Sequence, residues 1–215
     1  MVKTRLNQNL PAAAVIALYR CLLGDTLALA KSLTGIEIAV MCPEADRDEL
    51  TQLLGTAVHI VAQNGAGLAA GLTTVFRHFT EAGRKHVIAF NSDSPHLAPS
   101  VLQRAFEILH TCDVVVGPTH DGGYYLVGAK SAHPLLFEGD GMGTGSALDR
   151  LLTRTKTLEL TTGFTEPFYD IDVADDLMQL AVELQAAPTR APRTAAWFGE
   201  WEREVAHLRQ GLGKL

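Results

Sequence analysis

The sequence has few cysteines and no long uninterrupted run of apolar residues. Its three cysteines, Cys21, Cys42 and Cys112, are odd in number and widely spaced, with no CxxC pair. This usage excludes a disulfide framework and a zinc finger, and it predicts three buried thiols in a reducing cytoplasm. No apolar run approaches the roughly 18 residues that suggest a membrane span, and no apolar signal-peptide region follows the first basic residues. We therefore expect a cytoplasmic chain without a membrane span.

Basic residues are also scarce. The 215 residues include 18 Lys and Arg against 24 Asp and Glu, which gives a net charge of −6. Proteins that bind duplex nucleic acid depend on many Lys and Arg contacts with phosphates, so we expect no nucleic-acid partner. A local site for a small anion remains compatible with this charge. Hydrophobic residues make up 47% of the chain, which is enough for the full core of one large domain or two small ones.

Several well-known nucleotide and hydrolase motifs are missing. The sequence contains no P-loop, no GxGxxG fingerprint and no GxSxG elbow. A dinucleotide-binding oxidoreductase is therefore a distant alternative, since it also lacks the acidic residue expected about 20 positions after the fingerprint.

Short apolar runs rich in β-formers alternate with amphipathic helical patterns along the chain. Strands are predicted over residues 36–42, 57–63, 86–92, 113–118 and 123–129, and a weaker one over 156–160. Helices are predicted over residues 11–33, 44–54, 66–83, 99–110, 146–155 and 173–187. This alternation predicts an α/β fold with a mostly parallel, Rossmann-like sheet and helices on both of its faces.

A proline-containing stretch near the C-terminus suggests a boundary. We predict one domain over residues 1–187, followed by a linker and C-terminal helix over 188–215. The last helix, over about 195–210, would pack on the domain or on a second subunit. A homodimer is therefore an open alternative.

Carboxylates follow the ends of several predicted strands. Asp93 follows the strand over 86–92, Asp121 follows the strand over 113–118, and Asp170 and Asp172 precede the helix over 173–187. Open α/β sheets bind ligands beyond the carboxyl ends of their strands. Residues two apart in an extended segment share a face, so Asp170 can pair with Asp172, and Asn91 with Asp93. Such carboxylates suit Mg²⁺ or Mn²⁺, which bind one or two carboxylates together with phosphate and water.

Each carboxylate also has an ordinary structural interpretation. Asp at a strand end is often a turn residue or a helix cap. Asp121 precedes two glycines, which is typical of a tight turn, and Asp175 and Asp176 are placed to cap the following helix. The combination of positions favours a site more than any single residue does.

Two further stretches could contact a nucleotide. Lys3 and Arg5 could hold a di- or triphosphate, although their spacing alone favours a solvated segment. The glycine-rich junction "QNGAGLAAGL" at 63–72 would allow a base or ribose to approach the backbone.

Four stretches resemble a known family when they are taken in order. They are "VKTRL" at 2–6, "NSDSPHL" at 91–97, "DVVVGPTHDGGYYLVG" at 113–128 and "YDIDVADDL" at 169–177. The sequence resembles, over about residues 2–185, bacterial GT-A-like proteins labelled as glycosyltransferases or radical-SAM/selenodomain-associated transferases. This family is also similar to phospholactate guanylyltransferases and to molybdenum-cofactor nucleotidyltransferases.

The resemblance implies a nucleotide-diphospho-sugar transferase fold with a divalent metal. Asp93 would take the place of the metal-binding DxD carboxylate, and Asp172 would complete the Mg²⁺ or Mn²⁺ site. The resemblance assigns the nucleotide phosphates to Lys3 and Arg5. The other implied binding residues are Asn91 and Ser92 beside Asp93, Gly67 and Leu68 near the nucleoside, and Asp121, Gly122 and Gly123 on the acceptor side.

The sequence departs from the family at two places. The family usually has a first strand before "KTRL", whereas here Met1 stands directly before this motif. That strand would lie inside the sheet, so we expect an interruption among the paired strands. Asn91 also stands where the family usually has glycine.

The leading functional hypothesis is a metal-dependent glycosyltransferase of the GT-A type that uses a nucleotide sugar and a small-molecule acceptor. Asp93 and Asp172 would hold the metal, and Asp121 is a candidate base. One alternative is a nucleotidyltransferase that joins an NTP to a small phosphorylated acceptor. Another is a catalytically silent binding protein that keeps the fold.

Overall fold

The computed structural model of the chain describes residues 5–137 and 145–212. The chain forms two compact units. The helical unit comprises Met1–Ser32, Ser92–Ala98 and Tyr169–Leu215, and the sheet unit comprises Leu33–Asn91 and Pro99–Phe168. The predicted division at residue 187 stays a prediction. In these units the C-terminal residues group with the N-terminal helix.

The sheet unit contains the six strands of the described residues. Strand β1 (Ala39–Pro43) pairs in parallel with β2 (His59–Gln63). A second sheet has the order β3-β5-β4-β6, formed by β3 (Val87–Phe90), β5 (Tyr124–Ala129), β4 (Val114–Pro118) and β6 (Thr162–Phe164). Strand β5 runs antiparallel to both of its neighbours, and β4 runs parallel to β6. The α/β prediction is confirmed, with β5 as the antiparallel member of the sheet.

Helices cover both faces of the second sheet. They include α3 (Gly67–Glu81) and α4 (Pro99–Thr111). The same unit also contains α2 (Arg47–Leu54) and α5 (Ala147–Thr157). Val114 and Val116 share a core cluster with Phe76 of α3, whose ring stacks on Phe137 at 5.1 Å. Val115 points to the opposite face and is also fully buried. Burial on both faces explains why β4 is a continuous valine run rather than an alternating pattern.

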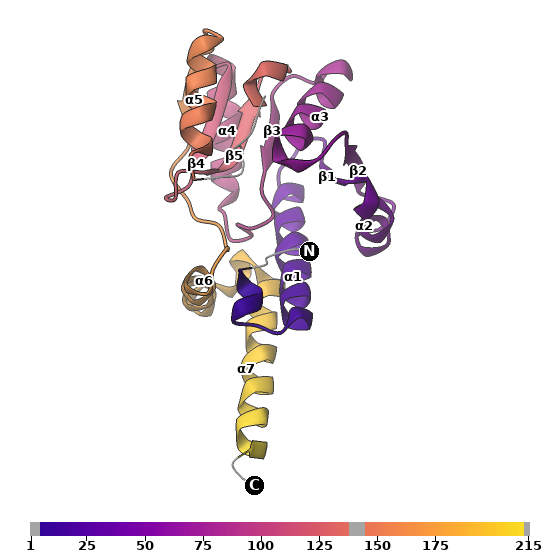
Figure 1. Cartoon of the computed structure of the whole chain (residues 1–215), viewed down its shortest axis with the longest axis vertical. Helices are drawn as coiled ribbons and strands as arrows, with labels where there is room; N and C mark the ends of the chain where they lie inside the picture. Colours follow the sequence, from indigo (N-terminus) through magenta and orange to yellow (C-terminus); the bar gives the residue numbers. More distant parts are fainter. Residues whose placement is uncertain (1–4, 138–144, 213–215) are drawn as a thin grey trace. The chain divides into compact units, whose positions relative to one another are not determined.

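The two sheets are separated between β1 and β3. Helix α3 packs on β1, β2 and β3, so both sheets lie under the same helix (Figure 1). In the part of the chain that the structure describes, β1 pairs only with β2, and β3 pairs only with β5. The described residues thus form two separate sheets, of two and four strands.

The pairing of the strands predicts which backbone amides exchange fastest with water. Backbone amides at an unpaired strand edge are open to water, whereas β4 and β5 are paired on both edges. We expect the least protected amides of β1 and β3 to exchange at least about tenfold faster than those of β4 and β5. Strand β2, which is also paired on one edge, is the internal comparison. Equal protection of β3 and β4 would contradict the open edge.

The predicted strand over 156–160 is wrong. Helix α5 continues to Thr157, Glu159 adopts a φ of 53°, and the strand begins only at Thr162. Asp113 fixes this later start, since its Oδ2 accepts hydrogen bonds from the backbone N–H of Thr161 at 3.0 Å and from its hydroxyl at 2.6 Å. A partner 48 residues away therefore selects the pairing residues.

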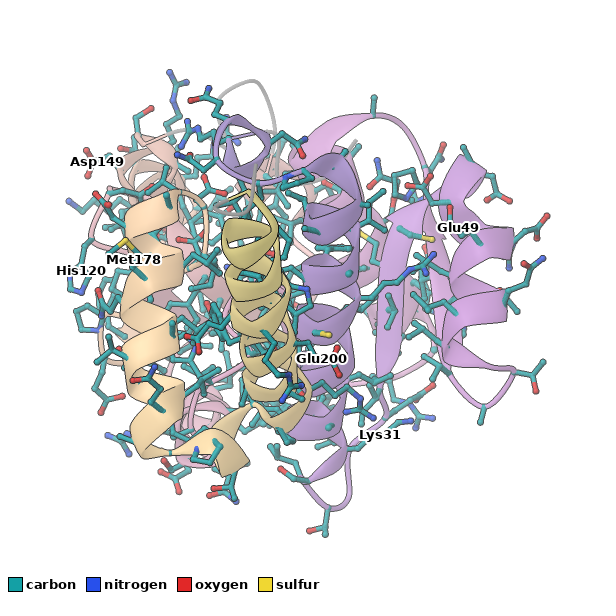
Figure 2. The ribbon with its side chains drawn as sticks, turned by 90° about the horizontal axis from the view of Figure 1, so that it is seen from below. Lys31, Glu49, His120, Asp149, Met178 and Glu200 are labelled. Carbon is teal, nitrogen blue, oxygen red and sulfur yellow. The ribbon has the colours of Figure 1, made fainter. Side chains whose placement is uncertain are left out.

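The helical unit consists of three helices and their connections. Helix α1 (Ala12–Lys31) contacts α7 (Pro192–Leu212), and α7 contacts α6 (Ala174–Ala186). Figure 2 shows the three helices beside one another, with the exposed Met178 on the side of α6 away from α7. The core contains Leu6 from the short helix η1 (Leu6–Gln8), Leu18, Leu22, Ile171, Leu180 and Trp197. Helix α7 packs within this unit.

Helix α1 is long and apolar enough to cross a membrane by length and composition alone. Its buried side chains, including Leu18 and Leu22, belong to the core of the helical unit. It also carries Asp25, which is buried and accepts hydrogen bonds from the first turn of α7. These contacts are those of a packed core helix.

The three cysteines are free thiols. Only Cys42 is buried, whereas Cys21 and Cys112 are partly exposed. The prediction of three buried thiols is therefore wrong for two of them: Cys21 is a partly exposed residue of α1, and Cys112 follows the last residue of α4.

Candidate functional site

Two segments of the helical unit carry the predicted metal ligands. The backbone N–H of Ile171 donates to the carbonyl of Asp93 at 3.0 Å, and the hydroxyl of Ser94 donates to the carbonyl of Tyr169 at 3.0 Å. Ser94 and Ile171 are fully buried, while Asp93 is partly exposed. These bonds hold the backbone of Asp93 beside the segment that leads to Asp172. The structure thus brings together two chain segments that lie far apart in the sequence.

The backbone of Asp172 is fixed by a hydrogen bond, whereas its carboxylate is partly exposed. Asp176 accepts hydrogen bonds from the backbone N–H groups of Asp172 at 2.9 Å and Val173 at 2.8 Å. The predicted helix cap at Asp176 is therefore confirmed. The carboxylate of Asp172 accepts a hydrogen bond from the guanidinium of Arg5 at 3.1 Å, in an ion pair whose side chains are 46% and 68% exposed.

The donors in these segments fit a hard divalent cation. Asp93 and Asp172 offer carboxylate oxygens, and within residues 5–137 and 145–212 no group of three or more His, Cys, Asp or Glu side chains is placed to hold a metal. Mg²⁺ and Mn²⁺ commonly bind one or two protein carboxylates and take their remaining ligands from phosphate and water, whereas zinc sites need three or four protein ligands. The residues present therefore fit Mg²⁺ or Mn²⁺ better than zinc.

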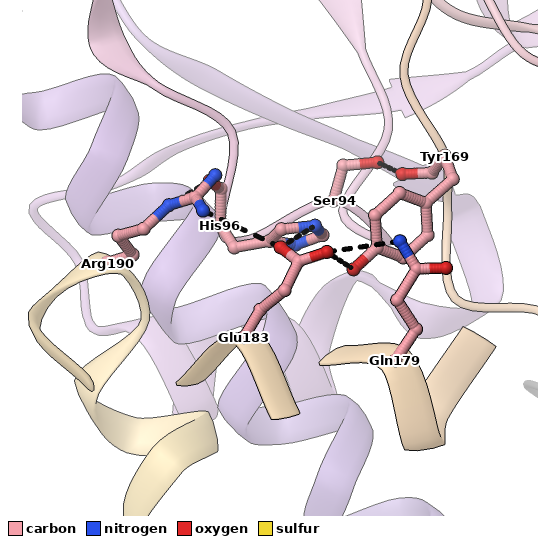
Figure 3. A network of polar contacts seen from close by, with 6 residues as sticks. All are labelled: Ser94, His96, Tyr169, Gln179, Glu183 and Arg190. Carbon is pink, nitrogen blue, oxygen red and sulfur yellow. Dashed lines mark hydrogen bonds and ion pairs between the residues drawn. The ribbon is translucent and has the colours of Figure 1, made fainter. Parts of the chain in front are cut away.

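A polar network links these segments to α6 (Figure 3); His96 and Ser94 are buried in it, whereas its other members are partly or largely exposed. Its centre is Glu183 of α6, whose Oε1 accepts hydrogen bonds from the Tyr169 hydroxyl at 2.8 Å and from Gln179 at 3.1 Å. The other oxygen of Glu183 lies 3.8 Å from Nε2 of His96 and 3.5 Å from Arg190. Arg190 also donates two hydrogen bonds to the carbonyl of His96, at 2.7 and 3.1 Å.

Burial sets the protonation states of this network. Desolvation lowers the pKa of the fully buried His96 to about 4, although nearby Glu183 opposes the shift. Desolvation likewise raises the pKa of Tyr169, and its hydrogen bond to Glu183 raises it further. For Glu183, burial alone would raise the pKa, but the hydrogen bonds from Gln179 and Tyr169 outweigh it and the net shift is downward. At neutral pH the network therefore holds a neutral imidazole, a phenol and a carboxylate.

Asp121 of the sheet unit shapes the turn between β4 and β5. Its carboxylate accepts hydrogen bonds from the Thr119 hydroxyl at 2.5 Å and from the backbone N–H of Gly123 at 3.2 Å. Gly122 has a φ of 86°, and a side chain there would collide with the backbone carbonyl of Gly145. The turn interpretation of this motif is confirmed, and the acceptor-side role of Asp121, Gly122 and Gly123 stays a prediction.

The remaining predicted residues belong to different elements of the fold. Gly67, with a φ of 82°, is the first residue of α3, and the next residue, Leu68, is 43% exposed. Asn91 of the sheet unit extends the pairing of β3, since its N–H donates to the carbonyl of Tyr125 at 2.9 Å. Ser92 belongs to the helical unit, where its carbonyl accepts a hydrogen bond from Thr26 at 3.3 Å. Lys3 lies outside the described residues.

Sequence reasoning missed the Glu183 network. His96 and Tyr169 each stand three positions from a predicted metal ligand, within the quoted motifs, and this proximity was the available signal. Glu183 and Arg190 have no such local signal. Glu183 and Arg190 belong to the network through their contacts with His96, which is 94 positions from Arg190 in the sequence.

Comparison with known families and structures places this fold. A family model described as "Uncharacterized protein conserved in bacteria (DUF2064)" matches residues 26–144, more than half of the chain. The chain belongs to the DUF2064 family. No curated protein matches it. The more specific resemblance to radical-SAM/selenodomain-associated transferases stays a prediction.

Solved structures share the fold of this DUF2064 member. A protein from Desulfovibrio desulfuricans G20, assigned provisionally as a nucleotide-diphospho-sugar transferase, superposes with a TM-score of 0.82 at 24% identity, over 96% of this chain and 91% of that chain. The 4-diphosphocytidyl-2C-methyl-D-erythritol synthase of Anaerococcus prevotii DSM 20548 gives a TM-score of 0.56 at 13% identity, over 76% and 86%. Rv0371c of Mycobacterium tuberculosis H37Rv gives 0.52 at 16% identity, over 74% and 83%. The chain therefore has the nucleotide-diphospho-sugar transferase fold.

Proposed function

We propose that this protein is a metal-dependent transferase that uses a nucleotide-activated donor, as a glycosyltransferase of the GT-A type does. The observation that most supports this proposal is the hydrogen bond between the backbones of Ile171 and Asp93, which holds two carboxylate-bearing segments together. The fold shared with the Desulfovibrio protein supports the same class. The donor is a nucleotide sugar, the acceptor is a small molecule, and the three free thiols are compatible with a reducing cytoplasm.

Asp93 and Asp172 would hold Mg²⁺ or Mn²⁺ in this proposal. A cation held there would supply the positive charge that neutralises a leaving diphosphate. Asp93 is carried by a loop whose next four residues are buried, which fixes its backbone, and the residue itself is partly exposed although its Oδ1 is buried. Fixed carboxylates need no rearrangement as charge develops, which is the main source of catalysis in such transfers.

Arg5 supplies the positive charge beside this pair. Its ion pair with Asp172 is largely exposed, and exposed pairs contribute about 0–1 kcal/mol. Asp172 could therefore exchange Arg5 for a divalent cation at little cost. The guanidinium of Arg5 would then be available to a phosphate group of the donor, together with Lys3, as the family resemblance implies.

The second candidate is a nucleotidyltransferase that attaches a nucleotide to a small phosphorylated acceptor. It is favoured by the similarity to the Anaerococcus synthase fold. Both reactions use the same metal, but they release different products. A glycosyltransferase releases a nucleoside diphosphate, whereas a nucleotidyltransferase releases pyrophosphate from an NTP. Product analysis with labelled donors distinguishes them.

Thermal unfolding with nucleotides tests the proposal first. We expect one of UDP, GDP, dTDP, CDP or their triphosphates to stabilise the protein only when Mn²⁺ is present. A ligand at about 100 times its Kd adds roughly 2.7 kcal/mol, which raises the Tm by about 5–10 °C for a chain of this size. Asp93→Asn should abolish this shift, because it removes a metal ligand without changing the shape of the side chain.

Asp175→Asn is the matched control for Asp93→Asn. Asp175 is an exposed carboxylate on the first turn of α6, close in sequence to Asp172. Its replacement should leave the metal-dependent shift intact. If no nucleotide shifts the Tm of a folded sample, the metal-dependent transferase proposal fails and the silent binding protein is favoured.

A further inference from the structure

The Glu183 network comprises Ser94, His96, Tyr169, Gln179, Glu183 and Arg190 (Figure 3). It connects three parts of the helical unit: the loop 92–98, the segment 169–173 and the C-terminal half of α6 with the following turn η4 (Pro188–Arg190). The loop 92–98 carries Asp93, and the segment 169–173 carries Asp172. The network therefore joins the two predicted metal ligands to one helix.

The network holds the first segment through both its backbone and its side chain. Two hydrogen bonds from Arg190 fix the carbonyl of His96. The imidazole packs against the ring of Tyr169, with ring centres 4.8 Å apart, and is fully buried. A displacement of Arg190 would therefore move the loop in which Asp93 stands three residues earlier.

The second segment is held in the same way. The hydroxyl of Tyr169 donates to Glu183 at 2.8 Å, and the Tyr169 carbonyl accepts the hydroxyl of Ser94 at 3.0 Å. Two residues later, Ile171 bonds to the carbonyl of Asp93. These two cross-connections, at Tyr169 and at Ile171, fix the offset between the segments on which Asp93 and Asp172 are carried.

We propose that Tyr169 and Glu183, acting with His96 and Ser94, are positioning residues that set the spacing of Asp93 and Asp172 for a bound divalent cation. The proposal rests on the proposed function, because it assigns the network a role at the same cation site. Groups that orient metal ligands typically contribute about 10–100-fold to metal affinity. Glu183 touches neither the cation nor the donor in this role, and it acts only through Tyr169 and His96.

Mn²⁺ binding followed by electron paramagnetic resonance tests this role, in the presence of the nucleoside diphosphate that stabilises the wild-type protein. We expect Tyr169→Phe to raise the Kd for Mn²⁺ by about 10–100-fold, since the ring remains on His96 but the bond to Glu183 is lost. Glu183→Gln, which keeps an acceptor for Tyr169, should raise the Kd less than Glu183→Ala. The spectrum of the bound ion should broaden in these variants as its ligands become less uniform.

A destabilised control separates positioning from general stability. Trp201→Phe weakens the stacking of Trp201 on Trp197, whose rings lie 5.9 Å apart on α7 in the same unit. It should lower the Tm and leave the Kd for Mn²⁺ unchanged at temperatures where the protein is folded. Tyr169→Phe should do the reverse and change the Kd more than the Tm.

Each outcome supports or overturns the inference. If the wild-type protein binds Mn²⁺ with a nucleotide, and Tyr169→Phe and Glu183→Ala bind it equally well, the positioning role is wrong while the proposed function stands. If Trp201→Phe raises the Kd as much as Tyr169→Phe does, the network is merely structural. If the wild-type protein binds no Mn²⁺ with any nucleotide, the proposed function and the positioning role fail together.

Discussion

Asp25→Ala is expected to lower the free energy of unfolding of the helical unit by about 3 kcal/mol. The carboxylate of Asp25 is fully buried at the start of α7. One of its oxygens accepts both the backbone N–H and the hydroxyl of Thr194 at 2.8 Å, and the other accepts the N–H of Arg193 at 3.2 Å. Alanine would leave these donors without an acceptor, in a place where water is excluded.

The size of this effect has two parts. Loss of the acceptor at the start of a helix costs about 0.5–2 kcal/mol. A buried hydroxyl left without a partner costs about 1–3 kcal/mol more. The guanidinium of Arg193 adds little, because it is 57% exposed and water solvates it after the substitution. The sum corresponds to a decrease in Tm of about 6–12 °C.

Tryptophan fluorescence measures this change selectively. The chain has two tryptophans, and both Trp197 and Trp201 lie on α7 in the helical unit. Asp25→Asn keeps an acceptor oxygen and should cost clearly less than Asp25→Ala. Asp175→Ala, at an exposed carboxylate, should change the free energy by less than about 0.5 kcal/mol. A loss of under 1 kcal/mol for Asp25→Ala would show that the buried carboxylate is not a structural link between α1 and α7.

Stability of the helical unit is expected to fall as the pH is lowered from about 6.5 to about 4, because of His96. Burial depresses the pKa of His96 to about 4, below the value of about 6.5 in an unfolded chain. In this window the unfolded state binds a proton that the folded state does not, so stability increases with pH. The full effect is about 3 kcal/mol, present above pH 6.5 and lost by pH 4.

Urea unfolding at several pH values, followed by tryptophan fluorescence, measures this dependence. Carboxylates also titrate at low pH, so the informative quantity is the difference between the wild-type protein and His96→Phe, which keeps a ring but cannot bind a proton. We expect a flatter pH dependence for His96→Phe. His120→Gln replaces an exposed histidine of the sheet unit and should leave the slope unchanged. Identical slopes for all three proteins would contradict a buried neutral imidazole at residue 96.

The periodicity of the sequence determined the class of fold and most of its elements. Burial along a strand or a helix repeats every few residues, so the pattern is visible without knowledge of the partners. The predicted strands at 113–118 and 123–129 match β4 and β5 within one residue. The helix cap at Asp176 was predictable for the same reason, since its partners lie at most four residues away.

Only the tertiary structure decided how the elements pair. The position of β5 between β3 and β4, antiparallel to both, depends on hydrogen bonds between strands and has no signature within any one strand. The weak strand pattern over 156–160 misled because its residues alternate in polarity. The true pairing begins at Thr162, after Asp113 has bound Thr161.

The residues of the candidate site also differ in whether the sequence alone could predict them. The sequence predicted Asp93 and Asp172 as metal ligands, because a carboxylate within a recognisable motif is a local feature. It did not identify Glu183, Arg190 or Asp25, whose partners lie far away in the sequence. A polar side chain becomes structural when burial removes water and leaves a specific donor or acceptor as its only partner. Asp25 is buried in this way. The long-range contacts of all three residues are properties of the folded chain, so only the tertiary structure could show them.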